Sequence, residues 1–283
     1  MTPEERIGIG QAMLATACFS TGAVFVRWAG ALPPIEITSL RLLIGAGLVA
    51  LTGWLTGQPC LLTRAALWRL LPIGIVCGVH FLSFIAALGF TTVAHALTLT
   101  YTAPLMIAAL SRIMLGEPLP SRTLPGTVLT LGGVAVLAGF DPRLSGLMLI
   151  GDGLAIGSAI TFALYSIMGR RERHNFPLLT YAAGVYLVAG VLTAPFALAF
   201  RGPSHPWPAL VAVGAMALIP SALGHTLYNG SLRRLHPSIP NLIATQEVTL
   251  GILLAWALLG EAPGWNAAAG VALTLSGIAL ILH

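Results

Sequence analysis

Polar side chains interrupt the apolar stretches of this 283-residue sequence, and they are the groups that could do chemistry. The deepest charge is Glu247, about eight residues into an apolar run that begins near position 239. A carboxylate inside such a run is costly unless it is paired, solvated or protonated. Glu247 is therefore expected to have one of two roles. It binds a substrate ammonium or a coupling proton, or it bonds a polar neighbour that fixes the position of its helix.

Two groups of polar residues have helical spacing. Ser221, His225 and Asn229 follow one another at i, i+4 and i+8, which places them on one face of a helix. A second stripe runs from Ser158 to Tyr165 at i, i+3 and i+7. The stripes predict the walls of a polar cavity, although Ser and Thr also bond their own helix carbonyls or join neighbouring helices.

The predicted substrate-binding residues combine these stripes with polar and aromatic positions of other apolar runs. They are His80, Ser83, Phe84, Thr100, Tyr101, Ser158, Tyr165, His225, Asn229, Gln246 and Glu247. The aromatic members either stack on a substrate or simply pack. No metal-ligand spacing, cofactor motif or catalytic residue is identified, and the three Cys are scattered without a recognisable framework.

Two further charges, Asp152 and Arg41, lie near the ends of predicted helices. Asp152 is expected to stabilise the N-terminal end of its helix, where the helix dipole favours a negative charge. Arg41 is explained equally by snorkelling and by contact with a substrate carboxylate. Apart from Arg41, no Arg is expected at mid-depth, which argues against phosphate or nucleotide-sugar substrates.

The composition indicates that the chain is embedded in a membrane. The chain is 57% hydrophobic and 8% charged, with a mean hydropathy of +0.89, whereas soluble domains carry about 25% charged residues. All 14 basic residues are Arg, which favours a bacterial source. The net charge of +5 does not indicate nucleic-acid binding, because the Arg residues lie in short gaps between apolar runs.

Ten apolar runs are long enough to predict transmembrane helices, each of about 20 residues. They are 7–29, 35–56, 66–89, 94–114, 123–140, 146–169, 177–200, 208–229, 239–259 and 265–282. The first run is too long and too weakly basic for a cleaved signal peptide, so it is expected to be a span. The sequence thus predicts an all-α integral membrane protein.

The distribution of Arg predicts the orientation. With the N-terminus in the cytoplasm, ten Arg fall on the inner side and four, at positions 27, 41, 143 and 201, on the outer side. This bias follows the positive-inside rule. Both termini are therefore predicted to be cytoplasmic.

An internal repeat divides the chain. Leu115-Gly116-Glu117 returns as Leu259-Gly260-Glu261, and Leu129-Thr130-Leu131 returns as Leu273-Thr274-Leu275, both 144 positions later. We predict two repeats, 1–141 and 142–283, of five spans each, so that the second is inverted. Paired glycines, among them Gly126 and Gly270, predict a scaffold or dimer surface formed by the fifth and tenth spans.

The chain resembles the drug/metabolite transporter superfamily, EamA type. The likeness is carried by Arg41 in its Ser-Leu-Arg-Leu-Leu context, by Gly151-Asp152, by the run from Ala255 to Glu261, and by Glu247 fourteen residues before Glu261. Within the family it is most similar to the bacterial YddG-like exporters of aromatic amino acids. Phe19 and Phe162 replace the Trp that is frequent in the family.

The resemblance implies a secondary transporter of the bacterial inner membrane, not an enzyme. It would export small metabolites, most simply aromatic or neutral amino acids, by alternating access through a cavity between the repeats, as a monomer or homodimer. Export of cationic or apolar drugs is the alternative, followed by a channel. The chain has no Lys, so no P-loop for ATP is possible. The exact substrate and any proton coupling stay open.

Overall fold

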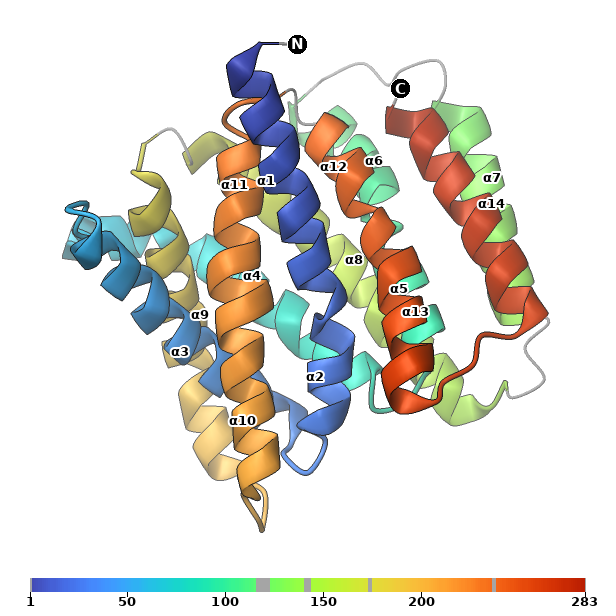
Figure 1. Cartoon of the computed structure of the whole chain (residues 1–283), viewed down its shortest axis with the longest axis horizontal. Coiled ribbons are helices and arrows are strands. Elements are labelled where there is room, and N and C mark those ends of the chain that lie inside the picture. Colours follow the sequence, from blue (N-terminus) through green and yellow to red (C-terminus); the bar gives the residue numbers. More distant parts are fainter. Residues whose placement is uncertain (1, 116–122, 140–143, 173–174, 236–237, 283) are drawn as a thin grey trace.

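The chain folds into a bundle of helices, seen in a computed structural model that describes residues 2–115, 123–139, 144–172, 175–235 and 238–282 (Figure 1). These residues form helices and no strand. The elements are α1 (Pro3–Ser20), α2 (Gly22–Trp28), α3 (Pro34–Leu55), α4 (Arg64–Ala87), α5 (Val93–Thr100), α6 (Ala103–Leu115), α7 (Thr123–Gly139), α8 (Gly146–Glu172), α9 (Leu178–Ala199), α10 (Trp207–Met216), the π-helix η1 (Ala217–His225), α11 (Thr226–Ser231), α12 (Ser238–Ala244), α13 (Gln246–Leu259) and α14 (Trp265–Leu282).

Seven stretches of the described chain are long and apolar enough to cross a membrane. Three shorter apolar helices lie within the predicted fifth, ninth and tenth spans. Large apolar side chains also face outwards; Ile113 and Trp207, for example, are 78% and 76% exposed. This surface suits lipid, so the chain is a multi-pass membrane protein, while the count of ten spans stays a prediction.

Several predicted spans are not continuous α-helices. The first is broken at Thr21, whose hydroxyl bonds the carbonyl of Cys18 at 2.7 Å, just before Gly22 begins α2. The fourth is broken at Tyr101 and Thr102, where Pro104 has no N–H to offer the carbonyl of Thr100. The ninth is broken at Thr245. A hydropathy run marks a span but does not show such breaks.

The eighth predicted span changes helix type at its centre. Pro220 lacks the N–H that would bond the carbonyl of Met216, and the Ser221 hydroxyl donates to that carbonyl instead, at 3.0 Å. The backbone widens here into η1. Residues after Pro220 therefore lose the α-helical face on which the sequence placed them.

The predicted fifth and tenth spans, α7 and α14, pack side by side (Figure 1). Their glycines allow the backbones to meet: a Cβ added to Gly270 would lie 2.8 Å from the Gly133 carbonyl oxygen. A Cβ on Gly277 would lie 2.6 Å from the carbonyl oxygen of Gly126. The pairing expected from the repeated glycines is therefore present. Glu117, which belongs to the repeat, lies outside the described residues.

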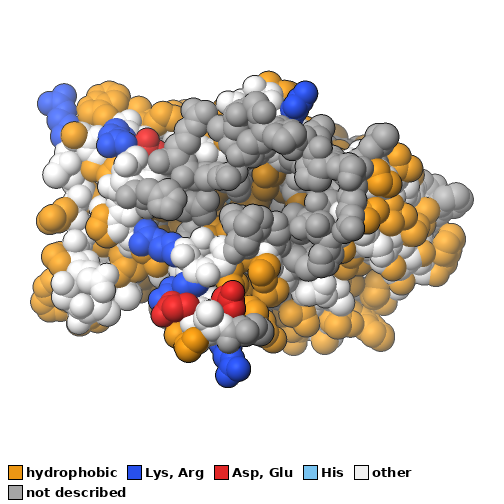
Figure 2. Space-filling model, turned by 90° about the horizontal axis from the view of Figure 1, so that it is seen from above, with side chains coloured by type: hydrophobic (Ala, Val, Ile, Leu, Met, Phe, Trp, Pro, Cys, Tyr) orange, Lys and Arg blue, Asp and Glu red, His pale blue; other side chains and the backbone are white. Residues whose placement is uncertain are grey.

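Both ends of the chain lie at the same end of the bundle (Figure 1). Ion pairs lie there, Arg69 with Glu172 at 2.8 Å and Arg234 with Glu4 at 3.0 Å, and Figure 2 shows charged side chains over this face. Following the predicted orientation, we call this the inner end and the opposite end, near Trp28, the outer end. The cytoplasmic placement of the termini stays a prediction.

Candidate functional site

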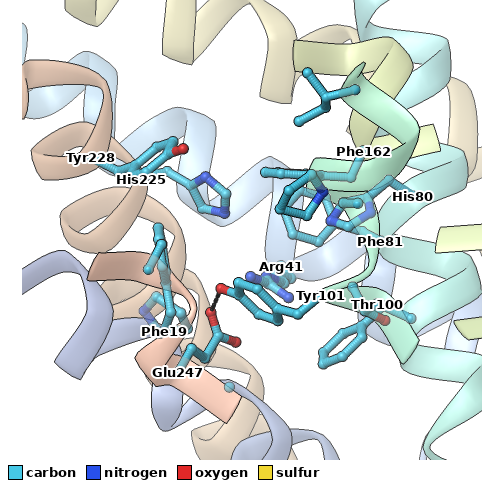
Figure 3. A pocket seen from close by; sticks show the side chains of 17 residues that line it. Phe19, Arg41, His80, Phe81, Thr100, Tyr101, Phe162, His225, Tyr228 and Glu247 are labelled. Carbon is cyan, nitrogen blue, oxygen red and sulfur yellow. Dashed lines mark hydrogen bonds between the residues drawn. The ribbon is translucent and has the colours of Figure 1, made fainter. Parts of the chain in front are cut away.

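A pocket inside the bundle collects side chains from both predicted repeats (Figure 3). Its lining comprises Phe19, Gly22, Arg41, His80, Phe81, Phe84, Thr100, Tyr101, Ala103, Pro104, Ile107, Phe162, Pro220, His225, Tyr228, Ala244 and Glu247. The cavity volume is about 90 Å³, below the roughly 300 Å³ at which ligand pockets begin. The pocket is therefore contracted in this conformation.

Arg41 is a buried cation of the pocket, 3% exposed and two turns into α3. Its Nε donates to the Ser221 hydroxyl at 2.7 Å, and its guanidinium lies 4.2 Å from the centre of the Phe81 ring. Arg41, which the sequence analysis set apart from the other Arg, thus lies in the centre of the bundle. Snorkelling does not explain its position, because the side chain points into the pocket and not towards an interface.

Glu247 is the matching anion of the pocket. It is the second residue of α13, where the N-terminal end of the helix dipole favours a carboxylate. The Tyr101 hydroxyl, from just beyond α5, donates to its Oε2 (Figure 3). Glu247 therefore both bonds a polar neighbour and faces the cavity, so the two explanations given by the sequence are compatible.

The two histidines of the pocket are held against aromatic rings. His80 Nδ1 lies 2.9 Å from the Ser158 hydroxyl and 3.0 Å from the Ser158 carbonyl oxygen. Its ring centre is 5.1 Å from that of Phe162. His225 lies 4.6 Å, centre to centre, from Phe19. These rings give the pocket a largely apolar aromatic wall.

Six of the predicted site residues line this pocket: His80, Phe84, Thr100, Tyr101, His225 and Glu247. Five do not. Ser158 lies behind His80, and the Asn229 side chain donates to the backbone carbonyl of His225 at 2.8 Å. Ser83 and Tyr165 are half-buried outside the lining, and Gln246 is exposed.

The sequence-based set omitted several lining residues. Arg41 had been left open between snorkelling and contact with a substrate carboxylate, and Phe81 and Tyr228 were not in the predicted set. Phe19 and Phe162 were noted only because they stand where the family has Trp. That substitution of one aromatic residue by another, in both repeats, was the available signal for an aromatic wall.

A second polar cluster, which we call the outer clamp, lies at the outer end and consists of Arg27, Glu261 and the backbone of Leu88, Thr91 and Val93. Arg27 Nε bonds Glu261 Oε1 at 2.8 Å, while its two terminal nitrogens donate to the carbonyl oxygens of Leu88 and, at 3.0 Å, Thr91. Glu261 Oε2 accepts from the Val93 N–H at 3.0 Å. The clamp joins α2, the α4–α5 connection and the α13–α14 connection.

Apolar membrane-crossing helices around a pocket lined from both halves of the chain have the architecture of a membrane transporter. The model of the EamA-like transporter family matches residues 6–139 and again residues 149–283. The chain belongs to this family.

Individual relatives are more distant. The chain is 29% identical over 213 residues to the aromatic amino acid exporter YddG of Ancylobacter novellus, covering 71% of each protein. It is 28% identical over 281 residues to the uncharacterized protein PA1977 of Pseudomonas aeruginosa, covering 95% of this chain and 92% of that one. A crystal structure with 24% identity matches with a TM-score of 0.74, covering 96% of this chain and 95% of that chain, which shows the fold.

Proposed function

We propose that the protein is a secondary transporter that exports a zwitterionic amino acid with an aromatic or apolar side chain across the bacterial inner membrane. The observation that carries this proposal is the presence of one buried Arg and one Glu in the same pocket (Figure 3). An α-carboxylate would bind Arg41 and an α-ammonium would bind Glu247. The substrate side chain would lie among Phe19, Phe81 and Phe162.

The similarity to an aromatic amino acid exporter supports this assignment. A phosphate-bearing substrate is disfavoured, because the single positive charge of Arg41 is balanced in the pocket by Glu247. The contracted cavity must widen before it can hold an amino acid. Such widening fits alternating access, in which two halves of the bundle move around a shared site.

The charges can be tested separately with three indole ligands that share the ring. Tryptophan has both charged groups, tryptamine has only the ammonium and indole-3-propionate has only the carboxylate. Purified protein in liposomes would be assayed for counterflow of labelled tryptophan and for binding of all three. We expect saturable tryptophan counterflow, which a channel does not produce.

Arg41→Gln should weaken tryptophan binding by about ten-fold to a hundred-fold, the equivalent of a lost charged hydrogen bond. It should leave tryptamine binding unchanged, whereas Glu247→Gln should weaken both. Arg201→Gln, at an exposed Arg of the α9–α10 connection, is the control and should change neither. Unchanged tryptophan binding in Arg41→Gln, with tryptamine as the better substrate, would instead favour the export of cationic drugs.

A further inference from the structure

A second buried pair of titratable side chains lies outside the pocket, between α8 and α5. Asp152 is 7% exposed and His95 is fully buried. His95 Nδ1 lies 3.1 Å from each oxygen of the Asp152 carboxylate, and the Thr91 hydroxyl donates to Asp152 Oδ1 at 2.7 Å. Neither side chain lines the pocket.

The helix-start role expected for Asp152 does not account for its position. Helix α8 begins at Gly146, so Asp152 lies in its second turn, beyond the first turn in which the dipole acts. A buried ionisable pair is also an expensive way to join two helices, since well-packed apolar residues often do so at least as well. Ionisable residues within membrane helices mark ion and proton pathways.

Few other charged or titratable groups face this pair from the described helices that pack on α8. Helix α4 contributes His80, which bonds Ser158, six residues further along α8. Helix α6 contributes Arg112, an exposed residue of its last turn. Arg27 of the outer clamp is linked to the pair by hydrogen bonds, because it donates to the backbone carbonyl of Thr91, the residue that bonds Asp152.

Thr91 connects the pair to the outer clamp. Its carbonyl oxygen accepts from Arg27 at 3.0 Å, and its hydroxyl donates to Asp152. A change of charge on Asp152 would therefore change the strength of its hydrogen bond to Thr91. This change could shift Thr91, whose carbonyl the clamp holds.

Helix α5 connects the pair to the pocket. This eight-residue helix carries His95 in its first turn and ends at Thr100, which lines the pocket. The next residue, Tyr101, bonds Glu247. One short element thus contacts the buried pair at one end and the proposed substrate site at the other.

We propose that Asp152 and His95 form the binding site of a coupling proton, separate from the substrate pocket. The pair takes up one proton from water on one side of the membrane and releases it to water on the other. Its net charge changes from −1 to 0, and no other bond forms or breaks. Through Thr91 and α5, its occupancy biases the outer clamp and the pocket. The proposal rests on the proposed function, because it requires a transported substrate.

The test uses proteoliposomes that contain a pH-sensitive dye, with tryptophan as the probe. Two measurements are made on each variant: tryptophan counterflow without a pH gradient, and tryptophan accumulation driven by a pH gradient, with dye-reported proton movement. Wild-type protein should show both. Asp152→Asn should retain counterflow within about two-fold, yet lose at least about ten-fold of the gradient-driven accumulation, because the equilibrium exchange needs no proton.

Glu36→Gln is the matched control. Glu36 is also a buried carboxylate bonded to a His, at 2.6 Å from His205, but it lies at the outer start of α3. This variant should keep its gradient-driven accumulation. His95→Asn provides a second variant that retains a donor near Asp152 but removes the titratable ring, and it should lower the accumulation several-fold.

The outcomes separate the two proposals. Absence of tryptophan counterflow in wild-type protein would overturn the proposed function and this inference together. If wild-type protein shows tryptophan counterflow but no accumulation driven by the pH gradient, only the proposal of a coupling proton is overturned. An undiminished gradient response in whichever of the Asp152→Asn and His95→Asn variants folds would overturn that proposal as well.

Discussion

Tyr101 is a hydrogen-bond partner of Glu247 in the pocket. Its hydroxyl already occupies Oε2 of the carboxylate that we assign to the substrate ammonium. An incoming ammonium must therefore displace or share this hydrogen bond. At the scale of a single residue, the contracted pocket is a site whose anion already has a partner.

Removing that partner should strengthen binding. In Tyr101→Phe, tryptophan and tryptamine should both bind up to about ten-fold more tightly, since a hydrogen bond to a charged group contributes roughly 1.5 kcal/mol or more. Indole-3-propionate, which has no ammonium, should bind unchanged and serves as the control ligand. Isothermal titration of the three ligands measures the effect; weaker tryptamine binding would show instead that the hydroxyl contacts the substrate.

The types of the site residues were predictable from the sequence, but their directions were only partly so. Glu247 was recognised as the deep charge, whereas the adjacent Gln246 points outwards because neighbouring helix positions face different ways. The stripe through Ser221, His225 and Asn229 assumed an α-helix. In η1 that period fails, and the three side chains bond Arg41, line the pocket and bond a backbone carbonyl, respectively.

Two helix breaks of the fold are related by the internal repeat. Tyr101, between α5 and α6, and Thr245, between α12 and α13, are 144 positions apart, the same offset as the repeated Leu-Gly-Glu. Each break lies beside the pocket, and together they supply Tyr101 and Glu247. Discontinuous helices are a common way of building a site within the membrane.

Hydropathy therefore indicated most helices but not their interruptions. Seven of the predicted runs contain described helices long and apolar enough to cross a membrane, and the other three contain shorter apolar helices; the ends shift by a few residues, as at Pro3 and Pro34. The breaks depend on local backbone bonding, such as the missing N–H of Pro104 and Pro220, which an average over 20 residues does not register. The π-helix at Pro220 was not predicted from the sequence.

The contact between α7 and α14 provides a test at the scale of elements. In Gly133→Ala the new Cβ would lie 2.5 Å from the Thr274 backbone nitrogen, so the helices must separate. We expect a loss of about 1–3 kcal/mol in stability, typical of overpacking. Gly132→Ala is the adjacent control, since its Cβ would meet no atom within 4 Å, and it should be neutral or slightly stabilising.

Thermal unfolding in detergent, followed by the loss of monodisperse protein on gel filtration, measures both variants. Equal unfolding temperatures for the two would show that the glycine contact does not limit stability.

At the scale of the whole molecule, the outer clamp and the contracted pocket describe one conformation, in which segments of both predicted repeats are held together at the outer end. Opening towards the outside would require Arg27 to release Glu261 and two carbonyl groups. In the proposed transport cycle, the clamp would therefore contribute to the free-energy difference between this conformation and an outward-open one.

Arg27→Gln should shift that equilibrium towards the outside. With a reporter cysteine at Ala103, a buried pocket residue, in a Cys60→Ser background, we expect labelling by a membrane-impermeant maleimide in intact cells to accelerate several-fold, for an ion pair of about 1 kcal/mol. Arg201→Gln, which removes an exposed Arg from the same end, should leave the rate unchanged. A labelling rate in Arg27→Gln that matches the parent would contradict the role of the clamp.

The composition of the outer clamp also determines how easily mutation can abolish it. Only Arg27 and Glu261 act through side chains; the carbonyls of Leu88 and Thr91 and the N–H of Val93 belong to the backbone. Backbone carbonyls persist whatever side chain is substituted, and only proline at position 93 would remove the N–H. The α4–α5 connection can therefore vary in sequence and still contribute its backbone groups to the outer clamp. Substitutions that abolish the clamp are expected mainly at Arg27 and Glu261, which are 234 positions apart.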